Sequence, residues 1–269
     1  MIWKNFFRDL RHTATRLVSV MIITMLAVSV YTALSGILYN VDRICQGYFD
    51  AQNMADYWIT GTSLDAGDCR TLSALPGVTG VQPRVTADAE ERGNSEITLE
   101  IYAVPQDPEI NIPYVVEGRL PANSREIALS DQFARARGVA VGDWYELTLT
   151  VTGEKLRLLV CGLVKSPECL YHVNATTPSP DLSRYGFAYG GAELLEGLMG
   201  PNRYNQVCVT TADGADPRQF RQAVEAALGD RVVSILALED NGRAYFIMET
   251  RNNIAPILDM FPILFFLCA

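Results

Sequence analysis

The sequence has few of the residues on which catalysis and metal binding depend. It contains only two histidines, His12 and His172, and no C-x-x-C pair. The patterns G-x-x-x-x-G-K-[ST], G-x-S-x-G and H-E-x-x-H are also absent, so no phosphate loop, nucleophile elbow or zincin site is predicted. Asp88, Glu90 and Glu91 have the chemistry for acid–base work, but their place at a strand end favours a solvated surface. We therefore expect no catalytic residue, cofactor or metal site.

Cysteine is also scarce. The six are Cys45, Cys69, Cys161, Cys169, Cys208 and Cys268. Four of them fall in the long middle part of the chain, where disulfides would form if that part lies outside the cytoplasm. Cys161 and Cys208 sit inside apolar, strand-like runs, which favours buried thiols. Spacing alone fixes no connectivity, and both interpretations stay open.

Charge is missing altogether from residues 17–41, which read LVSVMIITMLAVSVYTALSGILYNV. At about 1.5 Å per residue this run is long enough to cross a hydrocarbon core of about 30 Å as a helix. It is longer than the apolar part of a signal peptide, and no A-x-A site follows closely, so a retained transmembrane helix is expected rather than a cleaved one. A second apolar run, residues 254–269, predicts the truncated start of transmembrane helix 2.

The charges that are present are distributed unevenly. Residues 1–16 carry four basic side chains and one acidic one, a net charge of +3. The net charge of the whole chain is −9, so the part after residue 41 has a net charge of −12. A basic start is typical of the cytoplasmic side of a membrane, which places the N-terminus inside and residues 42–253 outside. The acidic outer part has no electrostatic footprint for nucleic acid.

Residues 1–16 have a helical apolar pattern, with Trp3, Phe6 and Phe7 on one face. Such a segment is expected to form a cytoplasmic amphipathic helix lying in the inner headgroup layer. The residues expected at the inner membrane surface are Trp3, Lys4, Phe7, Arg8 and Arg11. The same pattern also fits a simple inward extension of the transmembrane helix.

Two β-α-β patterns stand about a hundred residues apart. The first is DYWITGTSLDAGDCRTLSALPGVTGVQP and the second is NQVCVTTADGADPRQFRQAVEAALGDRVVSIL. Two such units predict an α+β, ferredoxin-like domain in which residues 55–104 and 204–238 share one sheet. The domain is expected to comprise residues 42–104 and 203–253, including stalk helices.

Residues 105–202 differ in pattern and predict a small β-rich domain inserted into the first. A strand over 126–130 and a helix over 131–137 come first, followed by a hairpin with arms 144–151 and 155–164. In these arms Leu147, Leu149 and Val151 share one face, as do Leu156, Leu158 and Val160.

Taken in order, these segments resemble the extracytoplasmic half of an FtsX/MacB-like ABC transporter permease. The strings that carry the resemblance are KNFFRDLRHTATRLVSVMIIT, EGRLPANSREIALSDQFARARGVAVGDWYELT, VKSPECLY, YGFAYGGAELLEGLMG and FPILFFLCA. The resemblance covers nearly the whole chain, although spans three and four of that family are missing, which predicts a fragment.

The resemblance implies a porter-like subdomain built from the two β-α-β units and an inserted sabre-like subdomain. It also implies a permease that dimerises, lies in membrane lipid and docks onto a separate cytoplasmic ABC ATPase subunit. Such permeases export or extract a lipid, lipoprotein or peptide, with ATP hydrolysed on the separate subunit. The alternative is a membrane-anchored regulatory module that controls an extracytoplasmic partner such as a cell-wall hydrolase.

Overall fold

The structure is a computed structural model that describes residues 2–169, 181–242, 256 and 260. The chain divides into two compact units, Met1–Gly47 with Ile247–Ala269, and Tyr48–Phe246. Most of the expected second apolar segment, 254–269, lies outside the described residues.

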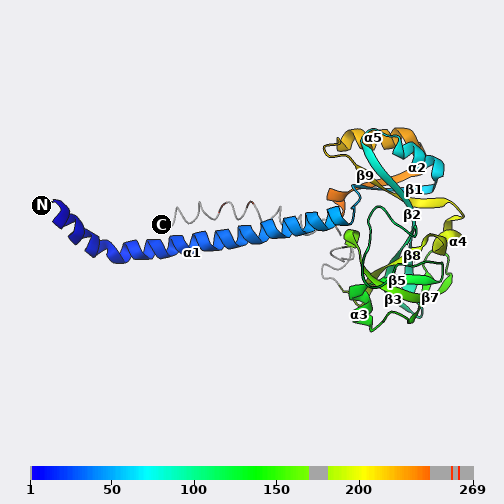
Figure 1. Cartoon of the computed structure of the whole chain (residues 1–269), viewed down its shortest axis with the longest axis horizontal. Coiled ribbons are helices and arrows are strands. Elements are labelled where there is room, and N and C mark those ends of the chain that lie inside the picture. Colours follow the sequence, from blue (N-terminus) through cyan, green and yellow to red (C-terminus); the bar gives the residue numbers. More distant parts are fainter. Residues whose placement is uncertain (1, 170–180, 243–255, 257–259, 261–269) are drawn as a thin grey trace. The chain divides into compact units, whose positions relative to one another are not determined.

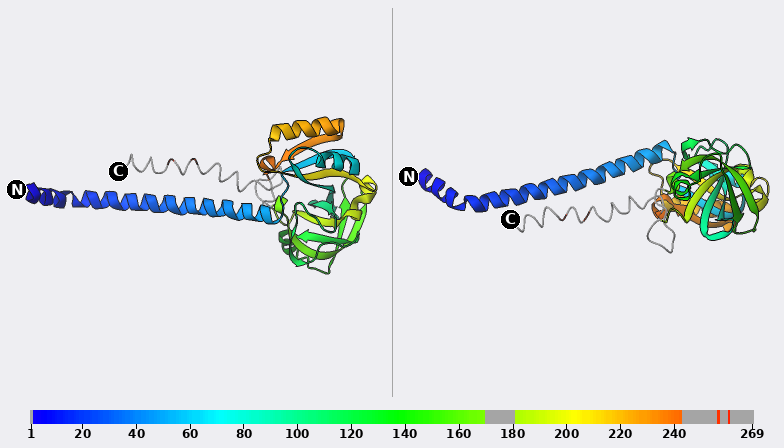
Figure 2. Two further views of the ribbon diagram at one scale, coloured as in Figure 1. Left: turned by 45° about the horizontal axis from the view of Figure 1, so that its top comes forward. Right: turned by 90° about the horizontal axis from the view of Figure 1, so that it is seen from below.

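The first unit is dominated by helix α1 (Ile2–Ala51), which continues without interruption from the basic start through the charge-free run. Figures 1 and 2 show a bend toward its N-terminal end. Within the described residues, the stretch Val18–Ala51 is long and apolar enough to cross a membrane by length and composition. Many of its large apolar side chains are exposed, including Met25 and Leu26. Such exposure suits lipid better than water.

The second unit contains a lobe in which two helices cover one face of a four-stranded sheet. The strands are β1 (Tyr57–Asp65), the first half of β2 (Val78–Glu91), β9 (Arg203–Thr211) and β10 (Val232–Ala237). The helices are α2 (Ala66–Ser73) and α5 (Pro217–Leu228). The antiparallel strand order β10-β1-β9-β2 is that of the ferredoxin-like fold predicted from the two β-α-β patterns.

This first lobe, the helix lobe, has its own core. Tyr57 stacks on Phe220 of α5 with ring centroids 4.2 Å apart, and Ile59, Val207 and Val209 are fully buried under the helices. Both helices begin at a capping aspartate. Asp65 forms a capping box with Asp68 at α2, and Asp216 precedes Pro217 at the start of α5. Figures 1 and 2 show α2 and α5 on the same side of the sheet.

The other lobe, the barrel lobe, is a closed barrel. The second half of β2 pairs with β3 (Asn94–Val104), and the ring continues through β8 (Tyr185–Gly191), β5 (Glu126–Ser130), β7 (Lys155–Lys165) and β6 (Trp144–Leu149) back to β2. Strand β4 (Tyr114–Gly118) pairs with β7 outside this ring. Closure leaves the six ring strands without a free edge.

Short helical segments complete the two lobes and their connections. They are α3 (Asp131–Arg137), η1 (Pro167–Cys169), η2 (Ala192–Leu195), α4 (Glu196–Met199), η3 (Gly229–Arg231) and η4 (Leu238–Asp240). The barrel interior is filled by apolar side chains from every ring strand and from α3. Leu147, Leu149, Leu158 and Val160 point inward as expected, whereas Val151 is 76% exposed because the strand ends at Leu149 and a turn follows.

The boundary between the lobes falls inside one strand. Residues 78–84 of β2 pair with β9, and residues 85–91 pair with β3. Strand β3 itself pairs with β8 in the barrel. The expectation that residues 55–104 form a single sheet with 204–238 is therefore wrong for β3, which lies in the barrel because its inward face (Ile97, Leu99, Ile101, Ala103) completes that core.

The described cysteines of the second unit are thiols, as favoured from their apolar surroundings. Burial raises the pKa of Cys161 to about 11 and the pKa of Cys208 to about 12. A thiol with such a pKa is almost entirely protonated at neutral pH and reacts slowly with alkylating reagents.

Candidate functional site at the helix-free face of the sheet

The face of the helix lobe that carries no helix is covered by two segments from elsewhere in the chain. Cross-strand neighbours on this face are Trp58, Cys208 and Gln82 in one row, and Gln206 with Arg84 in the next. We call these five residues the helix-free face. A sheet face left open would expose apolar and polar side chains together, but here Trp58, Cys208, Gln82 and Arg84 are all buried.

The first covering segment is the loop 109–112, which is fixed by Gln82. The Gln82 side-chain oxygen accepts hydrogen bonds from the backbone N–H groups of Glu109 (2.7 Å) and Ile110 (3.0 Å). Its amide nitrogen donates to the carbonyl oxygen of Ile110 at 3.0 Å. One glutamine thus satisfies three backbone groups of a loop, which explains a polar side chain at a 6% exposed position.

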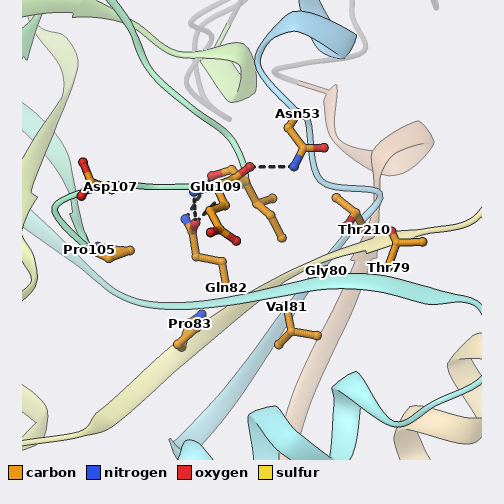
Figure 3. A pocket seen from close by; sticks show the side chains of 11 residues that line it. Asn53, Thr79, Gly80, Val81, Gln82, Pro83, Pro105, Asp107, Glu109 and Thr210 are labelled. Carbon is orange, nitrogen blue, oxygen red and sulfur yellow. Dashed lines mark hydrogen bonds between the residues drawn. The ribbon is translucent and has the colours of Figure 1, made fainter.

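The same loop holds the chain that follows α1. The backbone N–H of Asn111 donates to the carbonyl of Asn53 at 2.9 Å, and that of Ile112 donates to Gln52 at 2.8 Å. Asn111 accepts a hydrogen bond from the Ala55 N–H at 2.7 Å, and Asn53 donates to the carbonyl of Glu109 at 2.6 Å. Figure 3 shows Asn53 and Gln82 directed at the backbone beside Glu109 from two sides. We call the loop 109–112, together with Gln82 and residues 52–55, the clamp.

Both asparagines of the clamp adopt left-handed backbone conformations, with φ of 45° at Asn53 and 54° at Asn111. Asparagine tolerates this region better than most residues because its short side-chain amide can form hydrogen bonds with nearby backbone groups. The clamp borders a polar pocket of about 440 Å³ that is also lined by Thr79, Gly80 and Thr210. Residues 52–55, which follow α1, are therefore held to the loop 109–112 by hydrogen bonds.

The second covering segment is the turn 166–169, which follows β7 and brings Glu168 against Arg84. The guanidinium donates two hydrogen bonds to the Glu168 carboxylate, both at 2.6 Å, and a third to Gln206 at 2.7 Å. The indole N–H of Trp58 donates to the same carboxylate at 2.8 Å. Both charged side chains are almost fully buried, with side-chain exposures of 2% and 5%.

Aromatic rings of the barrel lobe enclose this ion pair. The Arg84 guanidinium lies over the Tyr102 ring at 4.5 Å from its centroid, a cation–π geometry. The Tyr189 hydroxyl is 2.8 Å from the Ser166 hydroxyl, and the backbone N–H of Glu168 donates to Ser166 at 3.2 Å. Burial holds the pKa values of Tyr102 and Tyr189 well above their ordinary range, so both hydroxyls stay protonated.

Chemically, this arrangement fixes segments in place and offers no reactive group. Glu168 is fully engaged by Arg84 and Trp58, and Cys208 is a protonated, buried thiol. Among the described residues, no group of three or more His, Cys, Asp and Glu side chains is placed to hold a metal ion. The contacts hold the loop 109–112 and the turn 166–169 rigidly against the sheet.

The residues singled out from the sequence lie elsewhere. Trp3, Lys4, Phe7, Arg8 and Arg11 all belong to α1, and their place at a membrane surface stays a prediction. Glu91 accepts hydrogen bonds from Arg137 at 2.7 Å and Tyr145 at 2.9 Å, and is thus part of the structure of the barrel lobe. The helix-free face was not identified from the sequence. Its one signal is a basic residue, Arg84, in the middle of the long strand-like stretch that begins at Val78.

Comparison with known families identifies the family of the chain. The family of MacB-like periplasmic core domains matches residues 17–227. The chain belongs to that family. A search among curated protein sequences found no match.

Three solved structures are similar to the chain. The periplasmic region of MacB from Actinobacillus actinomycetemcomitans has 14% identity and a TM-score of 0.42, covering 73% of this chain and 92% of that one. The extracellular domain of the noncanonic ABC-type transporter YknZ from Gram-positive bacteria has 14% identity and a TM-score of 0.41, covering 67% and 100%. A domain of a permease protein from Porphyromonas gingivalis has 15% identity and a TM-score of 0.38, covering 67% and 88%.

The family and the apolar helix together describe a membrane protein with an extracytoplasmic domain. The α+β architecture and the MacB-like recognition made from the sequence are confirmed.

Proposed function

We propose that the chain is part of the permease subunit of an ABC transporter and transmits motion from a cytoplasmic ATPase to the extracytoplasmic domain. The substrate class is a lipid, lipoprotein or peptide, exported or extracted from the membrane. ATP is hydrolysed on the separate ATPase subunit, and a second permease copy completes the transporter.

The observation that carries this proposal is the clamp. A helix with the length and composition of a membrane span ends at Ala51, and the backbone of Gln52, Asn53 and Ala55 is then hydrogen-bonded to the loop 109–112. A flexible linker would dissipate a displacement of the helix end. Hydrogen bonds to a loop that is itself fixed to the sheet by Gln82 carry the displacement into the domain.

The partner is tested by reconstitution. The permease in nanodiscs should stimulate ATP hydrolysis by the ATPase subunit of its transporter, in a saturable manner and by several-fold. The outer domain has no phosphate loop, so the permease without the ATPase should show no hydrolysis above background. No stimulation at saturating permease would contradict the proposal and favour a regulatory module that works without an ATPase.

Topology gives an independent prediction. The turn around Thr152, between β6 and β7, is exposed, so a reporter fused there is expected to leave both cores intact. Alkaline phosphatase, which requires oxidation outside the cytoplasm, should be active at Thr152 and inactive at the N-terminus. A cytoplasm-only reporter should show the reverse pattern. Activity of that cytoplasmic reporter at Thr152 would overturn the orientation.

A further inference from the structure

The two lobes of the second unit have separate hydrophobic cores, and strand β2 crosses between them at Arg84 and Val85. The chain returns from the barrel lobe to the helix lobe between α4 and β9, and these two crossings between separate cores form a natural hinge. We infer that Arg84, Glu168 and Trp58 form a lock at this hinge, which holds the helix lobe and the barrel lobe as one rigid body.

The lock takes its parts from both lobes. Trp58 and Arg84 lie on the sheet of the helix lobe, and Glu168 follows β7 of the barrel. Arg84 also contacts both lobes directly: it donates a hydrogen bond to Gln206 of β9 in the helix lobe, and it lies over the Tyr102 ring of β3 in the barrel lobe. Rotating one lobe against the other would separate the carboxylate from three N–H donors at once.

Burial makes that separation costly. Arg84 is 3% exposed and Glu168 is 4% exposed, so water cannot replace the broken hydrogen bonds without first entering the interface. A buried ion pair often adds little to stability compared with apolar residues, yet it is strongly directional. Its effect here is to fix one relative position of the lobes. The inference does not depend on transport, because it concerns the outer domain in any state.

Cys208 provides a probe of the lock. Its thiol is fully buried on the helix-free face, in the same cross-strand row as Trp58. We therefore expect it to react only when the segments that cover this face move away. Cys161 lies in the barrel lobe and donates to backbone carbonyls there, so it reports on that lobe alone. The measurement is the alkylation rate of each cysteine by iodoacetamide, resolved by peptide mass spectrometry, on the full chain in nanodiscs.

Glu168→Gln should raise the alkylation rate of Cys208 by about 100-fold, because Arg84 loses its counter-charge in a buried site. The rate at Cys161 should rise much less, so the ratio of the two rates increases. The matched control is Glu126→Gln, which disturbs the bidentate Arg119–Glu126 pair inside the barrel lobe and should not raise that ratio.

Trp58→Phe removes one hydrogen bond to Glu168 and keeps the ion pair. It should raise the same ratio by a smaller factor, and it decides the question if Glu168→Gln does not fold. Equal acceleration at Cys208 and Cys161 in these variants would show a general loss of stability and overturn the lock. An unchanged rate at Cys208 would overturn it as well.

Discussion

Replacing Arg84 by methionine should lower the free energy of unfolding by about 3–5 kcal/mol, the usual cost of removing one partner of a buried ion pair. The substitution leaves Glu168 as an uncompensated charge that is 4% exposed, with the Trp58 indole as its one remaining side-chain donor among the contacts described above. Gln206 also loses the N–H group that it accepts from. Chemical denaturation of the full chain in detergent, followed by tryptophan fluorescence, measures the change.

The double substitution Arg84→Met with Glu168→Leu should regain most of that loss, since apolar pairs of similar volume often replace buried ion pairs at little cost. A matched surface control is Arg135→Met, which breaks an i,i+4 pair with Asp131 where the arginine side chain is 69% exposed. Its cost should stay below about 1 kcal/mol. A double variant no more stable than Arg84→Met would show that the charge itself is not the source of the effect.

Gly118→Ala should destabilise the chain by about 3 kcal/mol or more, because two independent costs coincide there. The glycine has φ of +74°, and a Cβ at that position would collide with the backbone carbonyl oxygen of Cys161 on β7. A backbone atom in a paired strand cannot move aside as a flexible side chain does. Strain in the left-handed region alone accounts for about 1 kcal/mol, and the collision adds the rest.

Gly153→Ala is the matched control for this prediction. Gly153 has a similar φ of +69°, but nothing lies within 4 Å of the added Cβ. It should cost only about 1 kcal/mol, from the backbone conformation. Equal losses at Gly118 and Gly153, measured by the same denaturation experiment, would show that contact with β7 is unimportant.

The segment around Gly118 is one of those that carry the family resemblance. The segment EGRLPANSREIALS was recognised as characteristic, and the structure explains it. Arg119 donates two hydrogen bonds at 2.7 Å to Glu126, and with the Ala122 N–H this lowers the pKa of Glu126 to about 2. The loop is thereby tied back to the start of β5. Local patterns of this kind, and the caps of α3 and α5, could be predicted because the interacting residues are close in sequence.

The long-range contacts could not be predicted in the same way. Glu168 lies 84 residues from Arg84 and 110 from Trp58. Asn111 lies 56 residues from Ala55. Neither Glu168 nor Asn111 belongs to a motif with a fixed spacing. The alternation of side chains along β2 predicts on which face of the sheet Arg84 lies, but not which residue it contacts. The placement of β3 was wrong for a related reason, since alternation shows that one face is buried but does not show against which core.

The central claim is that the state of the cytoplasmic ATPase reaches the outer domain through the clamp at Asn53, Gln82 and Asn111. The most direct measurement is the distance between spin labels at Thr152 in the two permease copies, recorded by pulsed electron resonance in nanodiscs with the ATPase subunit. Wild-type protein should show different distance distributions without nucleotide and with ATP and vanadate. Asn53→Ala with Gln82→Ala should retain ATP hydrolysis and lose most of that difference. Identical distributions in the two nucleotide states of the wild-type protein would contradict the account.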